Sequence, residues 1–133
     1  MQTEALLIAF RRRNGVKEML FLHSAHKHYF TLPGGQVYGH KDAEAALEHH
    51  LAEQLSALPP KIKPIGRVNG HTPDGRIMHV HLFTGEYTDA IHALTDEGQL
   101  EWLDKSRAHM YAGRLPTIIF DKIFAHLESL ELW

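Results

Sequence analysis

The sequence predicts an α/β fold in which helices flank a mixed β-sheet. Apolar runs of strand type alternate with segments of helical spacing, so that strands, a helix, further strands and a last helix follow one another along the chain. At 133 residues the chain has the length of one domain, and we expect residues 1–133 to share a single core.

The first two strands are expected at residues 5–10 and 16–22. Asn14 and Gly15 lie between them, and Asn-Gly between two apolar runs is the strongest short-range signal for a β-hairpin. Three arginines at 11–13 come just before this turn. They can form a phosphate-binding patch or the solvated end of a strand, and the sequence leaves both interpretations open.

A glycine turn and the helix after it form the most informative stretch. Pro33-Gly34-Gly35 predicts a turn, because proline presets one backbone angle and glycines allow other groups to approach closely. Such a turn can present backbone N–H groups to a phosphate. We expect the helix at residues 43–58, with Asp42 as its N-cap and Pro59-Pro60 as its end.

The apolar stripe of this helix predicts its buried face. The stripe consists of leucines at helical spacing, Leu47, Leu51, Leu55 and Leu58. Polar side chains gather along one edge of it, namely His50, Glu53 and Gln54, with His49 beyond Glu53. This edge can face a cleft, or it can simply border the core.

The second half of the chain predicts strands at residues 62–68 and 77–87, joined through a turn at 73–75. A polar loop at 89–100 and a helix at 116–130 follow. His79 and His81 share one face of the second strand, and three more histidines lie in an expected loop at 23–29. These histidines can bind a metal or a base, or they can be ordinary strand and surface residues.

Composition narrows the functional class. The formal net charge is −2 and the basic residues are dispersed, which argues against a protein held on nucleic acid by bulk charge. The absence of cysteine excludes disulfides, thiolate metal sites and cysteine nucleophiles. No apolar run approaches the roughly 18 residues of a membrane span, and the first residues lack the features of a signal peptide, so we expect no membrane association and a cytoplasmic location.

The run Leu32-Pro33-Gly34-Gly35, followed by Val37, Gly39 and a helix, resembles the signature of the Nudix (MutT-type) pyrophosphohydrolases, GX5EX7REUXEEXGU with U a bulky aliphatic residue. The resemblance implies an α/β/α sandwich. Aligned from Gly35, the first Glu of the signature falls at Lys41 and the Arg-Glu pair at His49-His50. The later Glu pair falls at Glu53 and Gln54, so Glu53 is the one signature carboxylate that this chain keeps.

A second part of the resemblance lies further along the chain. Residues 97–102, with the sequence EGQLEW, resemble a loop that supplies an additional carboxylate in the MutT branch, which gives that role to Glu97. The resemblance implies Glu53 and Glu97 as catalytic residues and Gly34 and Gly35 as phosphate-binding residues. The implied metal ligands are His50, Glu53, Gln54 and Glu97.

The chemistry that the resemblance implies depends on a divalent metal, usually Mg²⁺ or Mn²⁺, that neutralises the diphosphate and activates water. Three lost carboxylates and the ammonium of Lys41 shift the local charge by about four units, which weakens Mg²⁺ binding. Imidazole with carboxylate suits Zn²⁺ or Ni²⁺ better, so His49 and His50 can form a site for a softer metal.

Two functions follow for this sequence. The first is a divergent, weak and metal-dependent Nudix-type hydrolase of a nucleoside diphosphate-linked or related diphosphate substrate. The second is a catalytically impaired Nudix fold that acts as a nucleotide sensor or a protein-interaction module. Both take a small nucleotide or diphosphate as partner, and a homodimer is compatible with the apolar stripe of the last helix and Trp133 at its end.

Overall fold

A computed structural model describes residues 2–24, 30–71, 74–94, 98–110 and 117–133. Its elements are β1 (Gln2–Arg13), β2 (Val16–Ser24), β3 (Phe30–Thr31), β4 (Gly34–Gln36), α1 (Ala43–Gln54), β5 (Lys63–His71), β6 (Ile77–Glu86), β7 (Gly98–Asp104), α2 (Lys105–Met110) and α3 (Thr117–Ser129). Within these ranges one mixed sheet runs in the order β3-β2-β1-β6-β5, while β4 pairs with β1 and β7 with β2. The parallel pair is β1 with β6, and the other pairs are antiparallel.

The predicted hairpin is confirmed. Phe10 of β1 faces Met19 of β2, and Asn14 and Gly15 form the turn with φ angles of 53° and 78°. Two consecutive positive φ angles belong to the turn whose twist matches that of paired strands, and Asn-Gly adopts them at low cost.

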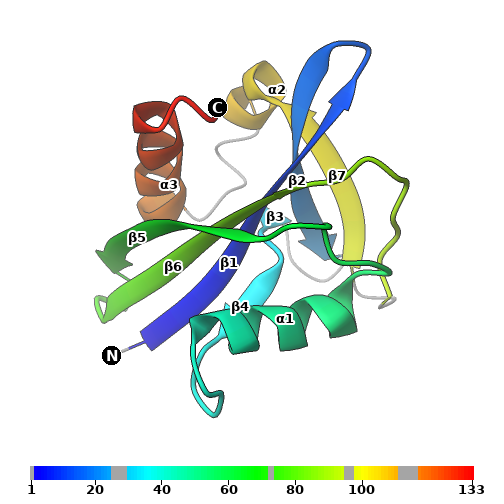
Figure 1. The fold of residues 1–133 in the computed structure, drawn as a ribbon. Helices are drawn as coiled ribbons and strands as arrows, with labels where there is room; N and C mark the ends of the chain where they lie inside the picture. The colour runs from blue at the N-terminus through cyan, green and yellow to red at the C-terminus, as the bar shows by residue number, and fades with distance from the viewer. Residues whose placement is uncertain (1, 25–29, 72–73, 95–97, 111–116) are drawn as a thin grey trace.

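Two apolar clusters pack on opposite faces of the sheet, because the side chains of β1 alternate between the faces. Ala5, Leu7 and Ala9 join the cluster of α1, whereas Ile8 and Phe10 join that of α3. Figure 1 shows α1 and α3 on either side of the central strands. The predicted α/β/α sandwich is therefore confirmed.

The end of the predicted helix at residue 58 is wrong. Helix α1 begins after the N-cap Asp42 as expected, but it ends at Gln54, and Leu55 is already extended with φ −125° and ψ 147°. The chain then pairs with residues 92–94: the Ser56 N–H donates to the His92 carbonyl, and the Leu94 N–H donates to the Gln54 carbonyl, each at 2.9 Å. Leu55 stays buried, but Leu58, expected in the core stripe, is 38% exposed.

The expected Pro-Gly-Gly turn also differs, because Gly34–Gln36 forms the short strand β4 along β1. The expected loop at 89–100 ends earlier, since β7 begins at Gly98, and neither β7 nor α2 was expected as a regular element. The last helix is confirmed as α3. Of the predicted turn at 73–75 and the loop at 23–29, residues 73 and 25–29 lie outside the described residues.

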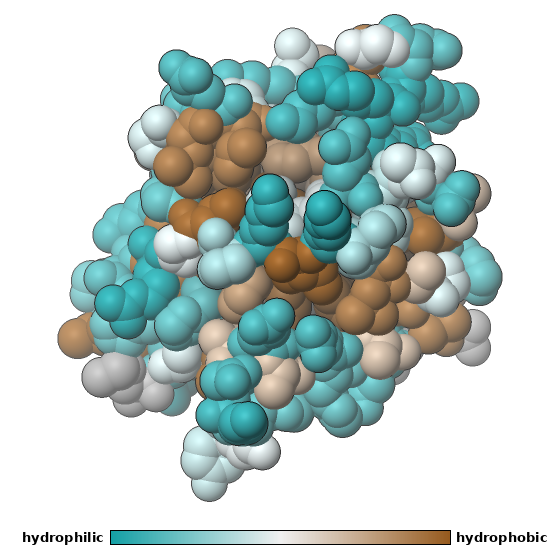
Figure 2. Space-filling view, viewed as in Figure 1, coloured by the Kyte–Doolittle hydropathy of each residue, from teal (hydrophilic) through white to brown (hydrophobic). Residues whose placement is uncertain are grey.

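The surface in the orientation of Figure 1 has apolar areas between hydrophilic side chains, with one such area near the centre of the view (Figure 2). The helices of the described ranges include none with the length and apolar character that a membrane span needs.

Candidate functional site

The glycine strand β4 lies against β1 because its first residue has no side chain. Gly34 has φ 131°, a region that favours glycine, and an added Cβ would collide with the Ala5 carbonyl oxygen of β1. The Leu7 N–H donates to the Pro33 carbonyl at 2.9 Å, and the Val37 N–H donates to the Thr3 carbonyl at 3.0 Å. These bonds hold β4 and the residues beside it in a fixed position next to the sheet.

Gln54, the last residue of α1, is joined to Gly34 by two hydrogen bonds. The Gly34 N–H donates to Gln54 Oε1, and Gln54 Nε2 donates to the Gly34 carbonyl, both at 2.9 Å. The side-chain amide matches the backbone amide group for group, because each supplies one donor and one acceptor. The pair fixes the C-terminal end of α1 to the glycine strand, and it uses the Gly34 N–H that was expected to face a phosphate.

His50 lies one turn earlier on α1 and packs beneath the same strand. Its Nε2 is 2.9 Å from the Gln36 carbonyl oxygen. A Cβ added at Gly35 would come within 2.8 Å of His50 Nε2, so the imidazole occupies the space that the glycine leaves open. The structure thus brings together four of the predicted site residues, Gly34, Gly35, His50 and Gln54.

Glu53 has its contact with another side chain of α1, His49. Its carboxylate lies 3.2 Å from His49 Nε2, and the two side chains are 66% and 54% exposed. An ion pair this exposed contributes little stability. The predicted metal ligands on α1 therefore divide between the glycine strand, which His50 and Gln54 contact, and solvent, which Glu53 contacts.

Three imidazole rings lie close together between α1 and the loop before it. The ring centroid of His40 is 4.9 Å from that of His49 and 5.4 Å from that of His50, and the His49 and His50 centroids are 5.7 Å apart. Their donor atoms do not converge: among the described residues there is no group of three His, Asp or Glu side chains arranged to hold a metal ion. His40 was not singled out from the sequence, because only the fold of the loop at 37–42 brings it to the helix.

Glu4 is a further carboxylate beside the glycine strand that sequence reasoning did not identify. It faces Gln36 across the β1–β4 pair and accepts a hydrogen bond from Gln2 Nε2 at 3.1 Å. Partial burial raises the pKa of Glu4, while the Gln2 hydrogen bond and the charge of nearby His50 act in the opposite direction. The sequence signal that could have pointed to it is a charged residue inside an apolar strand.

Glu97, the second predicted catalytic carboxylate, lies outside the described residues. Its role stays a prediction.

Similarity to known proteins comes from structure alone, because neither a protein-family model nor a curated protein matches this sequence. The NUDIX domain of Shewanella oneidensis NrtR, in complex with ADP ribose, superposes with a TM-score of 0.73 at 16% identity, covering 97% of this chain and 86% of that one. A MutT protein from Methanosarcina mazei Go1 gives 0.70 at 16% identity, with 96% and 94% covered.

This chain has the Nudix fold. A C. elegans Ap4A hydrolase agrees with this assignment, with a TM-score of 0.66 at 18% identity over 85% of this chain and 87% of that one. The stretch at 32–57 that resembles the Nudix signature comprises β4 and α1 in this structure. The alignment of Gln54 with a signature carboxylate stays a prediction from the sequence resemblance.

Proposed function

We propose that this protein binds a small molecule containing a nucleoside diphosphate at the glycine strand and α1, and that it has lost most of the metal-dependent hydrolysis that a complete Nudix signature supports. The observation that carries the second part of the proposal, the loss of metal-dependent hydrolysis, is the double hydrogen bond between Gln54 and Gly34. A carboxylate at this position could accept from the Gly34 N–H but could not donate to its carbonyl, so the amide is suited to holding the strand rather than a metal.

The placement of Glu53 supports the same proposal. A Mg²⁺ ion takes several oxygen ligands in near-octahedral geometry, and the protein must aim them at one point. Glu53 is 66% exposed and paired with His49, while Gln54 is hydrogen-bonded to Gly34 of β4. The two oxygen donors that α1 keeps at the aligned signature positions thus have different partners.

The ligand class is proposed from the structural neighbours. The NrtR NUDIX domain was crystallised with ADP ribose, and the Ap4A hydrolase is named for a dinucleotide. Both compounds carry adjacent phosphates, so ADP ribose and Ap4A are the first probes to use, together with nucleoside triphosphates and nucleotide sugars.

The test is a thermal unfolding series with these compounds, run separately with Mg²⁺, Mn²⁺ and Zn²⁺, with the integrity of each ligand followed by chromatography. A ligand that binds the folded state alone raises the Tm. We expect at least one compound to raise the Tm and to be recovered intact. If no compound shifts the Tm, the proposal is wrong.

Slow hydrolysis is the second candidate, and Glu4 is the observation that favours it. This partly buried carboxylate lies beside the glycine strand and adds an oxygen ligand to the exposed Glu53 of α1, while Glu97 lies outside the described residues. The metal would be Mg²⁺ or Mn²⁺ by resemblance, or Zn²⁺ or Ni²⁺ through His49 and His50. In the series above, turnover above background that Glu53→Gln abolishes would establish the hydrolase and exclude the binding protein.

A further inference from the structure

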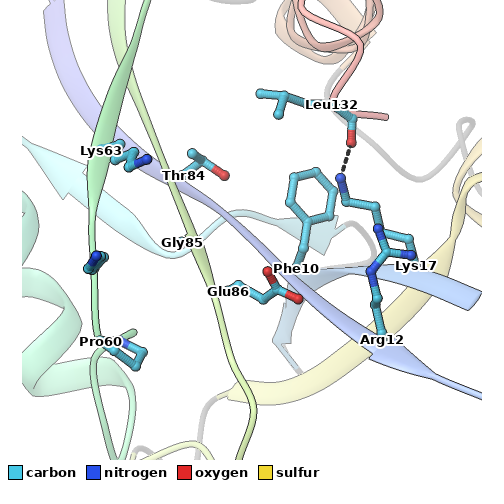
Figure 3. A pocket seen from close by; sticks show the side chains of 10 residues that line it. Phe10, Arg12, Lys17, Pro60, Lys63, Thr84, Gly85, Glu86 and Leu132 are labelled. Atoms are coloured by element: carbon cyan, nitrogen blue, oxygen red, sulfur yellow. Dashed lines mark hydrogen bonds between the residues drawn. The ribbon is translucent and has the colours of Figure 1, made fainter. Parts of the chain in front are cut away.

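A hollow lies at the end of the central strands away from β4, where the β1–β2 hairpin, the start of β5 and the end of β6 meet (Figure 3). Its volume is about 420 Å³. Phe10, Pro60, Gly85 and Leu132 supply backbone and apolar surface, and the polar lining consists of Arg12, Lys17, Lys61, Lys63, Thr84 and Glu86. We call this hollow the cationic groove.

Pairing of the strands brings these residues together from distant parts of the chain. Lys63 is opposite Thr84 in the β5–β6 pair, and Phe10 is beside Glu86 in the parallel β1–β6 pair. Thr84 Oγ1 donates to the Ile8 carbonyl at 3.0 Å, which fixes the end of β6 against β1. The groove is therefore built on regular strands rather than on loops.

Gly85 allows the segment at 59–61, which carries Lys61, to lie close to β6. A Cβ at this position would lie 2.7 Å from Pro59 Cβ and 3.0 Å from the Lys61 carbonyl oxygen. Real Cβ atoms do not approach other atoms so closely, so any larger residue would move the segment at 59–61 away from the sheet. Gly85 thus sets how closely the backbone of Lys61 approaches β6.

The charge of the groove is strongly positive. Four of the 14 Lys and Arg residues line it, against one carboxylate, in a chain whose formal net charge is −2. Figure 3 shows Arg12 and Lys17 on one side and Lys63 on the other, with Glu86 between them. Among the described residues, Arg12, Lys61 and Lys63 have no ion pair with an acidic side chain.

Two of the cations face each other directly. Arg12 and Lys17 are cross-strand partners in the hairpin, and like charges in this position destabilise a sheet. Lys17 is held in place by its contacts: its Nζ donates to the Leu132 carbonyl at 2.5 Å and lies 4.1 Å from the centroid of the Phe10 ring. Burial and the charge of Arg12 lower the pKa of Lys17, while Glu86 acts in the opposite direction. A bound anion would relieve this repulsion.

We propose that the cationic groove is a binding site for a small oligophosphate anion, separate from the glycine strand. Opposed cations on two walls suit a ligand with several phosphates in a row, since each lysine acts as a point charge that can pair with one phosphate. A groove volume of about 420 Å³ fits a small molecule. Phe10 is four residues along β1 from Leu6, the partner of Gly34, which places the two sites about 13 Å apart along the strand.

The test is calorimetric titration with inorganic tripolyphosphate at low ionic strength, where charge contacts are least screened. The variant Lys61→Gln/Lys63→Gln should weaken binding by about fivefold or more, and Glu86→Gln should tighten it by about twofold. The matched control is Arg107→Gln/Lys122→Gln, which removes the same charge from exposed helix positions outside the groove. It should leave the Kd within about twofold.

Three results would overturn the proposal. The first is the absence of measurable tripolyphosphate binding to the unmodified protein. The second is an equal loss in the groove variant and in the control, since that would reflect total charge rather than a site. The third is a single-stranded oligonucleotide whose binding depends on Lys61 and Lys63 while tripolyphosphate binding does not, because the groove would then be a nucleic-acid surface.

Discussion

The side chain of Gln54 has a role that a glutamate could not fill. Its amide accepts from the Gly34 N–H and donates to the Gly34 carbonyl, both at 2.9 Å. A glutamate would place an acceptor against that carbonyl and leave two oxygens facing each other. One atom of difference between amide and carboxylate therefore decides whether the end of α1 fixes the glycine strand or offers a charged ligand to a metal.

Gln54→Glu tests this role directly. At neutral pH the variant should lose about 1–3 kcal/mol of unfolding free energy, because the Gly34 carbonyl loses its donor and faces a charge. The loss should shrink in acid, where a protonated Glu can donate again. Urea denaturation at pH 7 and pH 4 measures both values, with Gln99→Glu at an exposed β7 position as the control. An unchanged stability at pH 7 would mean that the hydrogen-bond pair contributes nothing.

Glu4→Gln should change the pH dependence of stability. The pKa of Glu4 is raised by burial, so the folded state binds its proton more tightly than the unfolded state does. The stability that this proton provides is complete below the ordinary Glu value of 4.5 and is lost as the pH rises through the raised folded value. We therefore expect Glu4→Gln to be more stable than the unmodified protein at pH 7 and equal to it near pH 4. Thermal unfolding across this range measures the difference, and a gap independent of pH would contradict the assignment.

The polar edge of the helix could be predicted from spacing, but its partners could not. Helical geometry puts His50 and Gln54 one turn apart, which the structure confirms by placing both against β4. Glu4 and His40 join them only through the β1–β4 pairing and the loop before α1, contacts between residues far apart in sequence. The spacing of residues in the sequence predicts which side chains share a face of the helix. It does not predict which residues that face contacts.

At the scale of single elements, α1 shows why the start of a helix is easier to predict than its end. The N-cap is local: Asp42 accepts from the Ala45 N–H at 2.8 Å, within one turn. The end depends on residues 92–94, whose backbone forms hydrogen bonds with the Gln54 carbonyl and the Ser56 N–H. Pro59 and Pro60 set a limit beyond which the helix cannot continue, and this long-range pairing stops it earlier.

Substitutions at Leu51 and Leu58 separate the predicted helix from the observed one. Leu51 is fully buried, so Leu51→Ala should cost about 2–5 kcal/mol of unfolding free energy. Leu58 lies beyond the helix and is 38% exposed, so Leu58→Ala should cost less than about 1 kcal/mol. Chemical denaturation of the two variants gives the comparison. Similar losses would favour a helix that continues to residue 58.

The segment after α1 is tied to the sheet by Tyr87, whose hydroxyl donates to the Ala57 carbonyl at 2.7 Å. Burial raises the pKa of this hydroxyl, so it stays protonated and able to donate throughout the neutral range. Tyr87→Phe keeps the ring in its apolar cluster and removes the donor alone. We expect a loss of about 1 kcal/mol in unfolding free energy that does not vary between pH 6 and 9. A loss confined to one end of that range would point to a titrating group instead.

At the scale of the whole molecule, the sheet separates two apolar clusters. The sequence indicated them only through the alternation of side chains between the two faces of each strand. The long strands β1, β2, β5 and β6 and the helices α1 and α3 could be predicted because their periods are local. The parallel neighbours β1 and β6 are instead brought together by the chain between them. Phe83 belongs to the α1 cluster and Ile123 to the α3 cluster. If the sheet insulates the clusters, substitutions on opposite faces should act independently.

Phe83→Leu and Ile123→Val should each lower the unfolding free energy by about 1 kcal/mol, since each removes a small part of a buried side chain. Their combination should equal the sum within about 0.5 kcal/mol, because they share no cluster. The matched pair Ile8→Val and Ile123→Val lies within the α3 cluster. One side chain can shift into space left by the other, so the two losses of unfolding free energy should not add. Denaturant unfolding of the two double variants and their parents decides the question. The departure from additivity could be as large for the pair on opposite faces as for the pair within the α3 cluster. The strands would then transmit packing changes, and the two faces would form one core.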